Sequence, residues 1–515
     1  MNLIWKHEVT YCSLSMIFTQ ALSTPALVSA GNKVPSFAST VRHPVVVIFK
    51  EDTKYMSTRL LLVLGACFML SGCVSTRDYD TELGETLVYF QFGRLDDSLA
   101  VLERNNPFDP RDLLYYLEKG ELLRLKGEAS DSFATWDYAD RSIVAYENSS
   151  RFATFKKLTE LNSYVANDKL RFYDGYDFEK VALTTQMALI FMSSADPADA
   201  RVLIKKTHER EAGIAEKRDL QYLELENKAE AQGVTLQYKD LQGYPVATLD
   251  APEVVSLKNS YQSAFSHYLA GFIYEALNEK DLAAPGYRKA IELRPNTPLL
   301  EQALRNLDKS PLKAGESDVL LIVQTGLAPA RNSVHVPISV VVDGENYITN
   351  MSFPIIVPDT STPPVDFITV DGKNHKLTLL NSFGDMARRT LRDDMPGIIE
   401  RTLVRADAHA RDQAYLKKHH PEQLEAAIQA QILREDADTR SWRTLPDKTY
   451  VVRLRLSKGV HQFTLPNAPE FQPIKFRVDQ THQALSLRAV RNRIYIADRA
   501  LKIESTPPPQ PAILN

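Results

Sequence analysis

Cysteine is scarce in this chain of 515 residues, which holds only Cys12, Cys67 and Cys73. Three cysteines near one end cannot build a disulfide-stapled scaffold, so the fold must depend on packing. An excess of one charge is also lacking, because 61 basic and 65 acidic residues give a formal net charge of −4. A nucleic-acid-binding protein carries a basic surplus, and we therefore expect no nucleic-acid partner.

Common catalytic motifs are missing as well. The sequence contains no His-Glu-x-x-His, no Gly-x-Ser-x-Gly, no Walker loop and no Gly-x-Gly-x-x-Gly. His419 and His420 could ligate a metal, but they stand between two lysines and Pro421, which favours a solvated helix end. His409 has no partner at ligand spacing. We expect no enzyme activity and no cofactor or metal.

The segment from Met56 to Cys73 has the order of a secretory signal. Arg59 precedes an apolar run, Leu60–Leu70, and small residues follow it. The run is too short to cross a bilayer comfortably. Its end, Leu-Ser-Gly-Cys73, closely resembles the bacterial lipobox, which implies cleavage before Cys73 and acylation of that residue. After this cleavage the chain would keep no thiol that could pair or catalyse.

Residues 1–55 precede the signal and are interpreted as a mis-called extension, because signal peptidases act on signals at the beginning of a chain. The alternative is a cytoplasmic extension in which Leu60–Leu70 forms a core helix. Val74 stands where an aspartate would resemble an inner-membrane retention signal. The expected location is therefore the outer membrane, with the protein anchored by lipid on the periplasmic face.

A register repeats after 34 residues, which is the tetratricopeptide period. Glycines supply the tight turn between two helices, and small residues let the helices approach. The two copies are Thr86, Tyr89, Gly93, Ser98, Leu102 and then Gly120, Leu123, Gly127, Ser132, Trp136. A later unit resembles the tetratricopeptide pattern more closely, and its residues are Ala270, Gly271, Tyr274, Ala283, Tyr287, Ala290 and Pro295. A looser copy comes before it, at Ala188, Phe191, Ala200, Ile204 and Thr207. The alternative is an ordinary set of helical hairpins.

These units predict a tetratricopeptide-like helical solenoid over residues 73–310, with a partner bound in its groove. Residues 237–252 read as a loop over one rim of the array, and Tyr244 and Pro245 are the candidate partner contacts. The alternative for this loop is an idle connector.

The composition turns β-rich after residue 317, so the expected fold class is α+β. A sandwich-like domain occupies residues 317–383 and 441–500, a helical insertion occupies 384–437, and a proline-rich tail occupies 501–515. Two Asp-Gly pairs, at Asp343 and Asp371, predict hairpins. Alternation in the last strands places Arg453, Arg455, Lys475 and Arg477 on a wet face.

A wider resemblance is carried by Tyr176–Lys180, Tyr268–Gly271 and Ser441–Pro446. Together these segments look like a family of uncharacterised bacterial tetratricopeptide-containing lipoproteins, over most of the chain from Cys73 to about Ala497. The resemblance implies the architecture and brings no known activity.

Basic residues gather in one helical stretch, which makes Arg388 and Arg392 possible contacts for an anionic glycan or headgroup. Interleaved acidic residues favour mutual salt bridges in that stretch instead. The adjacent carboxylates Asp393–Asp394 and Glu435–Asp436 are interpreted as parts of a solvated face.

The function that these features favour is a lipid-anchored periplasmic scaffold that binds protein partners through its repeats, in cell-envelope assembly or maintenance. The alternative is a peptidoglycan- or glycan-binding protein or a cell-wall hydrolase, with its site in the C-terminal β-rich half.

Overall fold

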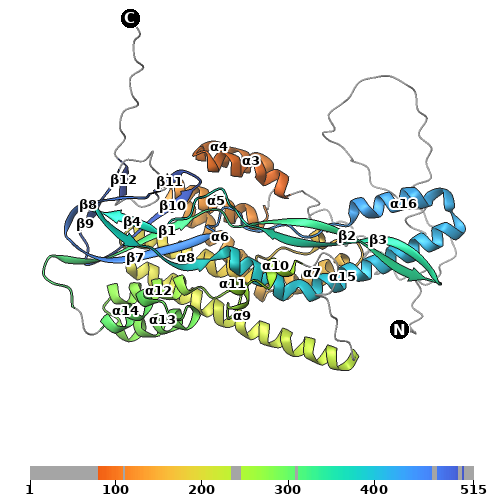
Figure 1. The fold of residues 1–515 in the computed structure, drawn as a ribbon, viewed down its shortest axis with the longest axis horizontal. Coiled ribbons are helices and arrows are strands. Elements are labelled where there is room, and N and C mark those ends of the chain that lie inside the picture. The colour runs from red at the N-terminus through yellow and green to blue at the C-terminus, as the bar shows by residue number, and fades with distance from the viewer. Residues whose placement is uncertain are drawn as a thin grey trace, which may run out of the picture.

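The computed structural model describes residues 79–107, 111–232, 245–307, 311–466, 473–496 and 501–503. The expected signal, Cys73 and Tyr244 lie outside the described residues. The molecule is elongated, with two five-stranded sheets toward one end of its long axis and a hairpin beside two helices toward the other (Figure 1). None of the helices in the described ranges has the length and hydrophobicity that a membrane span needs.

Helices make up the described chain as far as residue 306. They are α3 (Tyr79–Gln91), α4 (Leu95–Asn105), α5 (Leu113–Lys126), α6 (Ala129–Asn148), α7 (Ser150–Ser163), the 3-10 helix η2 (Asp168–Leu170), α8 (Asp177–Ser193), α9 (Pro197–Gln232), α10 (Val246–Leu249), α11 (Pro252–Val255), α12 (Ala264–Ala276), α13 (Lys280–Leu293) and α14 (Pro298–Asn306).

The helices pair into four hairpins, and equivalent contacts recur in some of them, which supports the tetratricopeptide-like repeats. They pair α3 with α4, α5 with α6, α8 with α9, and α12 with α13. A β-carbon on Gly120 would lie 2.2 Å from the Trp136 ring, and one on Gly271 would lie 2.4 Å from the Tyr287 ring. In both hairpins the missing side chain of the glycine makes room for an aromatic ring sixteen positions later.

The first two hairpins also repeat a hydrogen bond between their helices. Ser98 Oγ donates to the Thr86 carbonyl at 2.8 Å, and Ser132 Oγ donates to the Gly120 carbonyl at 2.7 Å. Successive hairpins then pack in chain order, α4 on α5, α6 on α8 and α9 on α12. The step of 34 residues seen in the sequence is therefore a step between equivalent contacts.

The strands form two five-stranded sheets and a separate two-stranded ribbon. One sheet has the order β11-β10-β1-β7-β6, the other has the order β12-β9-β8-β4-β5, and β2 pairs with β3. The strands are β1 (Glu316–Thr325), β2 (Ala330–Val342), β3 (Glu345–Val357), β4 (Phe367–Val370), β5 (Lys373–Lys376), β6 (Thr378–Ser382), β7 (Lys448–Ser457), β8 (Gly459–Thr464), β9 (Ile474–Val478), β10 (His482–Val490), β11 (Arg493–Tyr495) and β12 (Leu501–Ile503).

Apolar side chains from both five-stranded sheets form one cluster, as in a β-sandwich. Both Asp-Gly pairs are hairpin turns, since β2 leads into β3 and β4 leads into β5 across them. Antiparallel pairing dominates, although β1 lies parallel to β10 in the centre of its sheet. Strand β12 pairs with β9, so the β structure continues into the segment that we had assigned to the tail.

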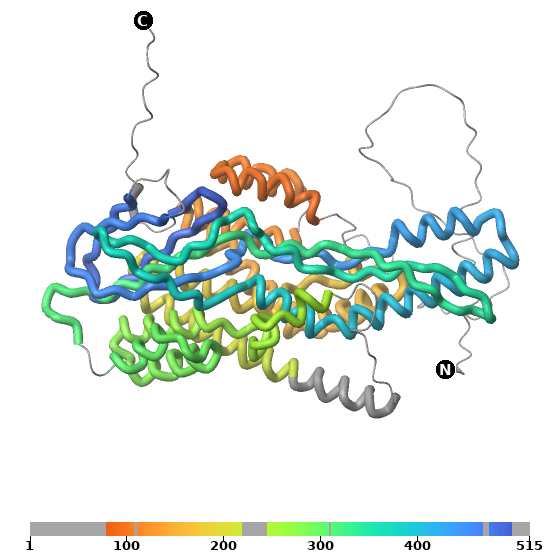
Figure 2. Tube along the Cα trace, in the orientation of Figure 1, coloured from red at the N-terminus to blue at the C-terminus, as the bar shows by residue number. Residues whose placement is uncertain are grey.

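Two further helices, α15 (Phe383–His419) and α16 (Pro421–Arg434), occupy the stretch between β6 and β7. The distal part of α15 runs beside the β2–β3 ribbon, and α16 packs against α15 (Figure 2). We call β2, β3, α16 and residues 397–419 of α15 the arm.

The largest hydrophobic core does not divide between helices and strands. It joins side chains of the repeat helices with side chains of β1, β7, β10 and α15, and Trp136, Leu320, Leu391 and Trp442 all belong to it. The change from helix to strand falls between α14 and β1, where we expected a domain boundary, but the core continues across it.

Candidate functional site

The first helices of the four hairpins all contact the C-terminal half of the chain. In α3 the Phe90 carbonyl accepts from the Tyr495 hydroxyl, and in α8 Gln186 bonds to Gln324 of β1. Helix α5 contributes Glu121 and Arg124, described below, and α12 packs beside β6. The face that these first helices form therefore packs against the C-terminal half of the same chain.

Trp442 is the anchor of the segment that fills this face. Its side chain is fully buried and meets Trp136 edge-on, with the ring centroids 5.8 Å apart. The indole Nε1 donates to Thr444 Oγ1 at 3.0 Å, so its polar atom is satisfied. Residues 435–447, which link α16 to β7, thus pass through the core rather than over the surface.

Two buried carboxylates of the repeats hold the backbone of this segment. Glu179 of α8 accepts from the Trp442 amide at 2.7 Å. Glu118 of α5 accepts from the amides of Arg443 and Thr444 at 2.7 and 2.9 Å. A hydrogen bond from an amide to a carboxylate is stronger than one between two neutral groups. These contacts therefore hold residues 442–444 in one position against α5 and α8.

Glu179 has a further local role at the start of α8. Its carboxylate also accepts from the Tyr176 amide at 2.9 Å and from the Tyr173 hydroxyl at 2.5 Å. Burial raises the pKa of Glu179 to about 7, although the hydrogen bonds to it act in the opposite direction. Burial also raises the pKa of Glu118.

Glu179→Gln is expected to flatten the pH dependence of stability. The folded pKa of about 7 lies above the ordinary value of 4.5, so folding takes up a proton between these values and stability falls as pH rises through them. The wild-type free energy of unfolding should drop by about 3 kcal/mol more across this window than that of the variant. Urea unfolding at pH 4.5 and 7.5 measures the difference, and parallel slopes would contradict it.

A second buried network ties the arm to the repeats. Arg405 of α15 donates twice to Glu435, at 2.6 and 2.8 Å, and also reaches Asp168 at 3.0 Å. Arg401 makes two hydrogen bonds to Asp168, at 2.8 and 3.0 Å. Glu435 also accepts from Ser352 of β3 at 2.6 Å. Our interpretation of Glu435 as a solvated residue is wrong, because it is buried among these donors.

A third network lies where the repeats meet the sheet that contains β1 and β10. Arg488 of β10 is fully buried and donates to the carbonyls of Gly326 and Thr444 at 2.6 and 2.9 Å. Its guanidinium is 3.5 Å from Glu121, which Arg124 engages with two bonds of 2.8 Å. Burial lowers the pKa of Arg488 to about 10.

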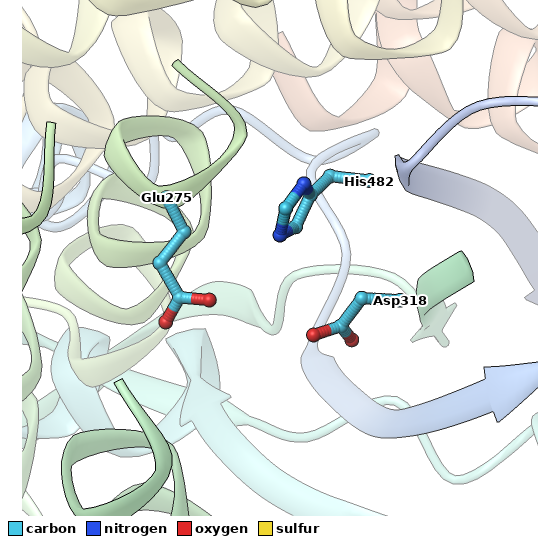
Figure 3. Close-up of side chains that lie close together, drawn as sticks. All are labelled: Glu275, Asp318 and His482. Atoms are coloured by element: carbon cyan, nitrogen blue, oxygen red, sulfur yellow. The ribbon is translucent and has the colours of Figure 1, made fainter. Parts of the chain in front are cut away.

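Glu275, Asp318 and His482 bring three groups with metal-ligand chemistry together (Figure 3). Arg453 of β7 already occupies this acidic site. It bonds twice to Asp318, at 2.7 and 2.8 Å, donates to Tyr287 at 3.0 Å and pairs with Glu275. Burial lowers the pKa of His482. The arrangement therefore matches an internal salt bridge, and our placement of Arg453 on a wet face is wrong.

The two arginines that we considered as anion contacts have carboxylate partners within the chain. Arg388 meets Asp385 at 2.5 Å and Glu253 at 3.0 Å, and Arg392 meets Asp250 at 2.7 Å. These bonds join α15 to the short helices α10 and α11. Pro245 precedes α10, which packs against α15.

The histidines considered as metal ligands lie at the end of α15. His419 and His420 pack near Tyr415, and burial lowers the pKa of His409. Among the described residues none of the three belongs to a group of three ligand-type side chains. Two cavities in the described ranges lie at the seam between repeats and strands, and each has a volume of about 10 Å³, which is room for about one water molecule.

The fold thus defines a protein of tetratricopeptide-like helical repeats joined to a β-rich half. No protein-family model matches the chain, and no curated protein matches it. Among solved structures it is similar to a tetratricopeptide repeat protein from Parabacteroides merdae ATCC 43184, at 15% identity. That match covers 44% of this chain and 98% of the other, with a TM-score of 0.13, which is too low to assign a fold.

Proposed function

We propose that this chain is a non-enzymatic scaffold of the bacterial cell envelope, held at the outer membrane by lipid on Cys73 and presenting its arm to protein partners. The observation that supports the proposal is that the buried charged groups form hydrogen bonds within the chain. Glu118, Glu179, Arg405 and Arg453 all bond to other parts of the chain, and of these four only Glu179 lines one of the two small cavities. Such groups stabilise a rigid body and leave none of these four for chemistry.

The arm suits a partner better than the covered face of the repeats does. Displacing residues 435–447 from that face would expose Trp442 and leave buried carboxylates without donors, which costs several kcal/mol. The arm instead carries apolar side chains that are already in water: Val341 is 65% exposed, Ile348 is 69% exposed and Leu433 is 83% exposed. Exposed apolar groups of this kind favour protein contacts.

The proposed location at the outer membrane rests on the resemblance of residues 70–73 to a lipobox. Cys73→Ser is expected to remove the protein from the outer-membrane fraction, because it abolishes both cleavage at the lipobox and acylation of residue 73. Fractionation with antibody detection measures the shift. Equal amounts of the wild type and this variant in the outer-membrane fraction would remove the anchor from the proposal.

The partner surface is tested by a photo-crosslinking amino acid at Ile348 or Leu433, with Val202 of α9 as control. Val202 is a matched control because it is 61% exposed but lies on the repeats. Crosslinked species should form from the two arm positions in intact cells and not from Val202. Equal patterns from all three positions would contradict a partner surface on the arm.

A further inference from the structure

The β2–β3 ribbon has one covered edge and one open edge. On β3, the Ser352 amide donates to Thr402 of α15 at 3.0 Å, and the Ile348 carbonyl accepts from Gln413 at 3.3 Å. These backbone groups therefore point away from β2. In an antiparallel pair the residues directly opposite have the same orientation, so the backbone groups of Ser339, opposite Ile348, point away from β3.

The outward residues of β2 follow in alternation from Ser339. The backbone groups of Pro337 and Val341 also point away from β3. Proline is compatible with this orientation, because its position needs no N–H for a hydrogen bond to β3. Helix α16 packs on the side of β3, because Gln413 also bonds to Gln431 of α16 at 2.9 Å. The N–H and C=O groups of Ser339 and Val341 have no hydrogen-bond partner within the described residues.

This edge differs from the sheet edges elsewhere in the described structure. Those edges are β5, β6, β11 and β12, which are three to five residues long, whereas β2 has 13 residues. Natural proteins shorten, charge or cover edge strands, because unpaired backbone groups accept another strand. Residues 338–342 read Ile-Ser-Val-Val-Val and carry no charge. The segment thus has the features of a docking strand.

We propose that residues 338–342 of β2 pair in antiparallel fashion with the same residues of a second copy of this chain, about a two-fold axis at Val340. In this register Ser339 lies opposite Val341 of the second copy, and the reverse pair is equivalent. Both pairs use outward backbone groups, so four hydrogen bonds form. Pro337 falls opposite Asp343, where φ is 52° and the strand turns, so the pairing ends there in both copies.

The occupant is a second copy because the edge is complementary to itself. The paired segment is uncharged, so no like charges meet at the axis. Val341 and Ile348 lie on the same face as Ser339, and the two-fold places these exposed side chains of both copies in one continuous strip. A five-residue pairing buries less surface than a standard interface, so the dimer is transient in solution and favoured where copies are concentrated on a surface.

A disulfide trap tests this register in the full-length chain. At the axis Val340 faces Val340 of the second copy in a non-hydrogen-bonded pair, where β-carbons are about 4.5–5.5 Å apart, close to disulfide distance. Val340→Cys is expected to give disulfide-linked dimer under mild oxidation. Asn346→Cys is the matched control, because it is exposed at the tip of the same ribbon but lies on β3, away from the axis. The parent chain controls for the native thiols.

A proline substitution distinguishes dimers formed by strand pairing from disulfides formed by random collision of two copies. Ser339→Pro removes an outward N–H without removing a β2–β3 hydrogen bond, so the ribbon should persist, as circular dichroism can verify. In the Val340→Cys background it should reduce the dimer yield at least fivefold, to the level of Asn346→Cys. Equal yields from the two cysteines, or a dimer that resists the proline, would overturn the proposal. Arm crosslinks to a different protein would still leave the scaffold function standing.

Discussion

Arg405→Met is expected to lower the free energy of unfolding by about 3–5 kcal/mol, because it leaves the buried carboxylate of Glu435 without its charge partner. Asp168 keeps Arg401, so the main loss falls on Glu435 and on the contact between the arm and the repeats. Methionine fills similar volume, which separates the loss of charge from the loss of packing. Urea unfolding followed by circular dichroism measures the change.

A matched control lies six residues further along α15, at Arg411. Arg411 forms an ion pair with Asp407 at 2.7 Å, but its side chain is mostly exposed. Arg411→Met should therefore change the free energy of unfolding by less than about 0.5 kcal/mol. If the two substitutions had the same effect, the buried network would not stabilise the join between arm and repeats.

Trp442→Ala is expected to cost about 3–5 kcal/mol, since it removes a fully buried indole from the seam between repeats and strands. The change also removes the edge-on contact with Trp136 and leaves Thr444 Oγ1 without the indole donor. Trp442→Phe keeps much of the volume and should cost less. Thermal and urea unfolding of the three proteins measure the series.

The series also discriminates between a buried anchor and a loosely attached segment. A surface segment would tolerate alanine within about 0.5 kcal/mol. Near-equal stability of Trp442→Ala and the wild type would therefore contradict the account of how residues 435–447 are held.

The sequence predicts the parts of this fold that depend on neighbours in the chain. The glycine at 120 and the tryptophan at 136 belong to one hairpin, and so do Gly271 and Tyr287, so their spacing alone indicates the contact. The Asp-Gly turns at 343 and 371 are equally local. Each of these features requires a short stretch of residues to specify both partners.

Contacts between distant segments escape such patterns. Glu435 lies in a polar stretch of the chain, and Arg453 alternates with apolar residues in a strand, and both patterns favour an exposed position. Their partners, Arg405 for one and Glu275 with Asp318 for the other, come from other elements. Burial of these charges follows from the packing of the β-rich half on the repeats, which periodicity does not encode.

One signal in the sequence could have revealed the covered face. Helix α5 carries Glu118 and Glu121 among leucines and tyrosines, and acidic residues inside an apolar helix require buried donors. The donors are the Arg443 and Thr444 amides and Arg124. Ser441–Pro446, one of the segments that carry the family resemblance, is also the segment whose backbone these carboxylates bind.

We expect the repeats and the β-rich half to unfold as one unit, because the β-rich half packs over the repeats. The most direct measurement uses the chain with Trp5→Phe, in which Trp136 and Trp442 are the remaining tryptophans and face each other. Urea unfolding is followed by tryptophan fluorescence and by helical circular dichroism. One transition is expected, with coincident midpoints for the two signals. A fluorescence change that precedes the loss of helix would show that the β-rich half detaches while the repeats stay folded, and would contradict unfolding as one unit.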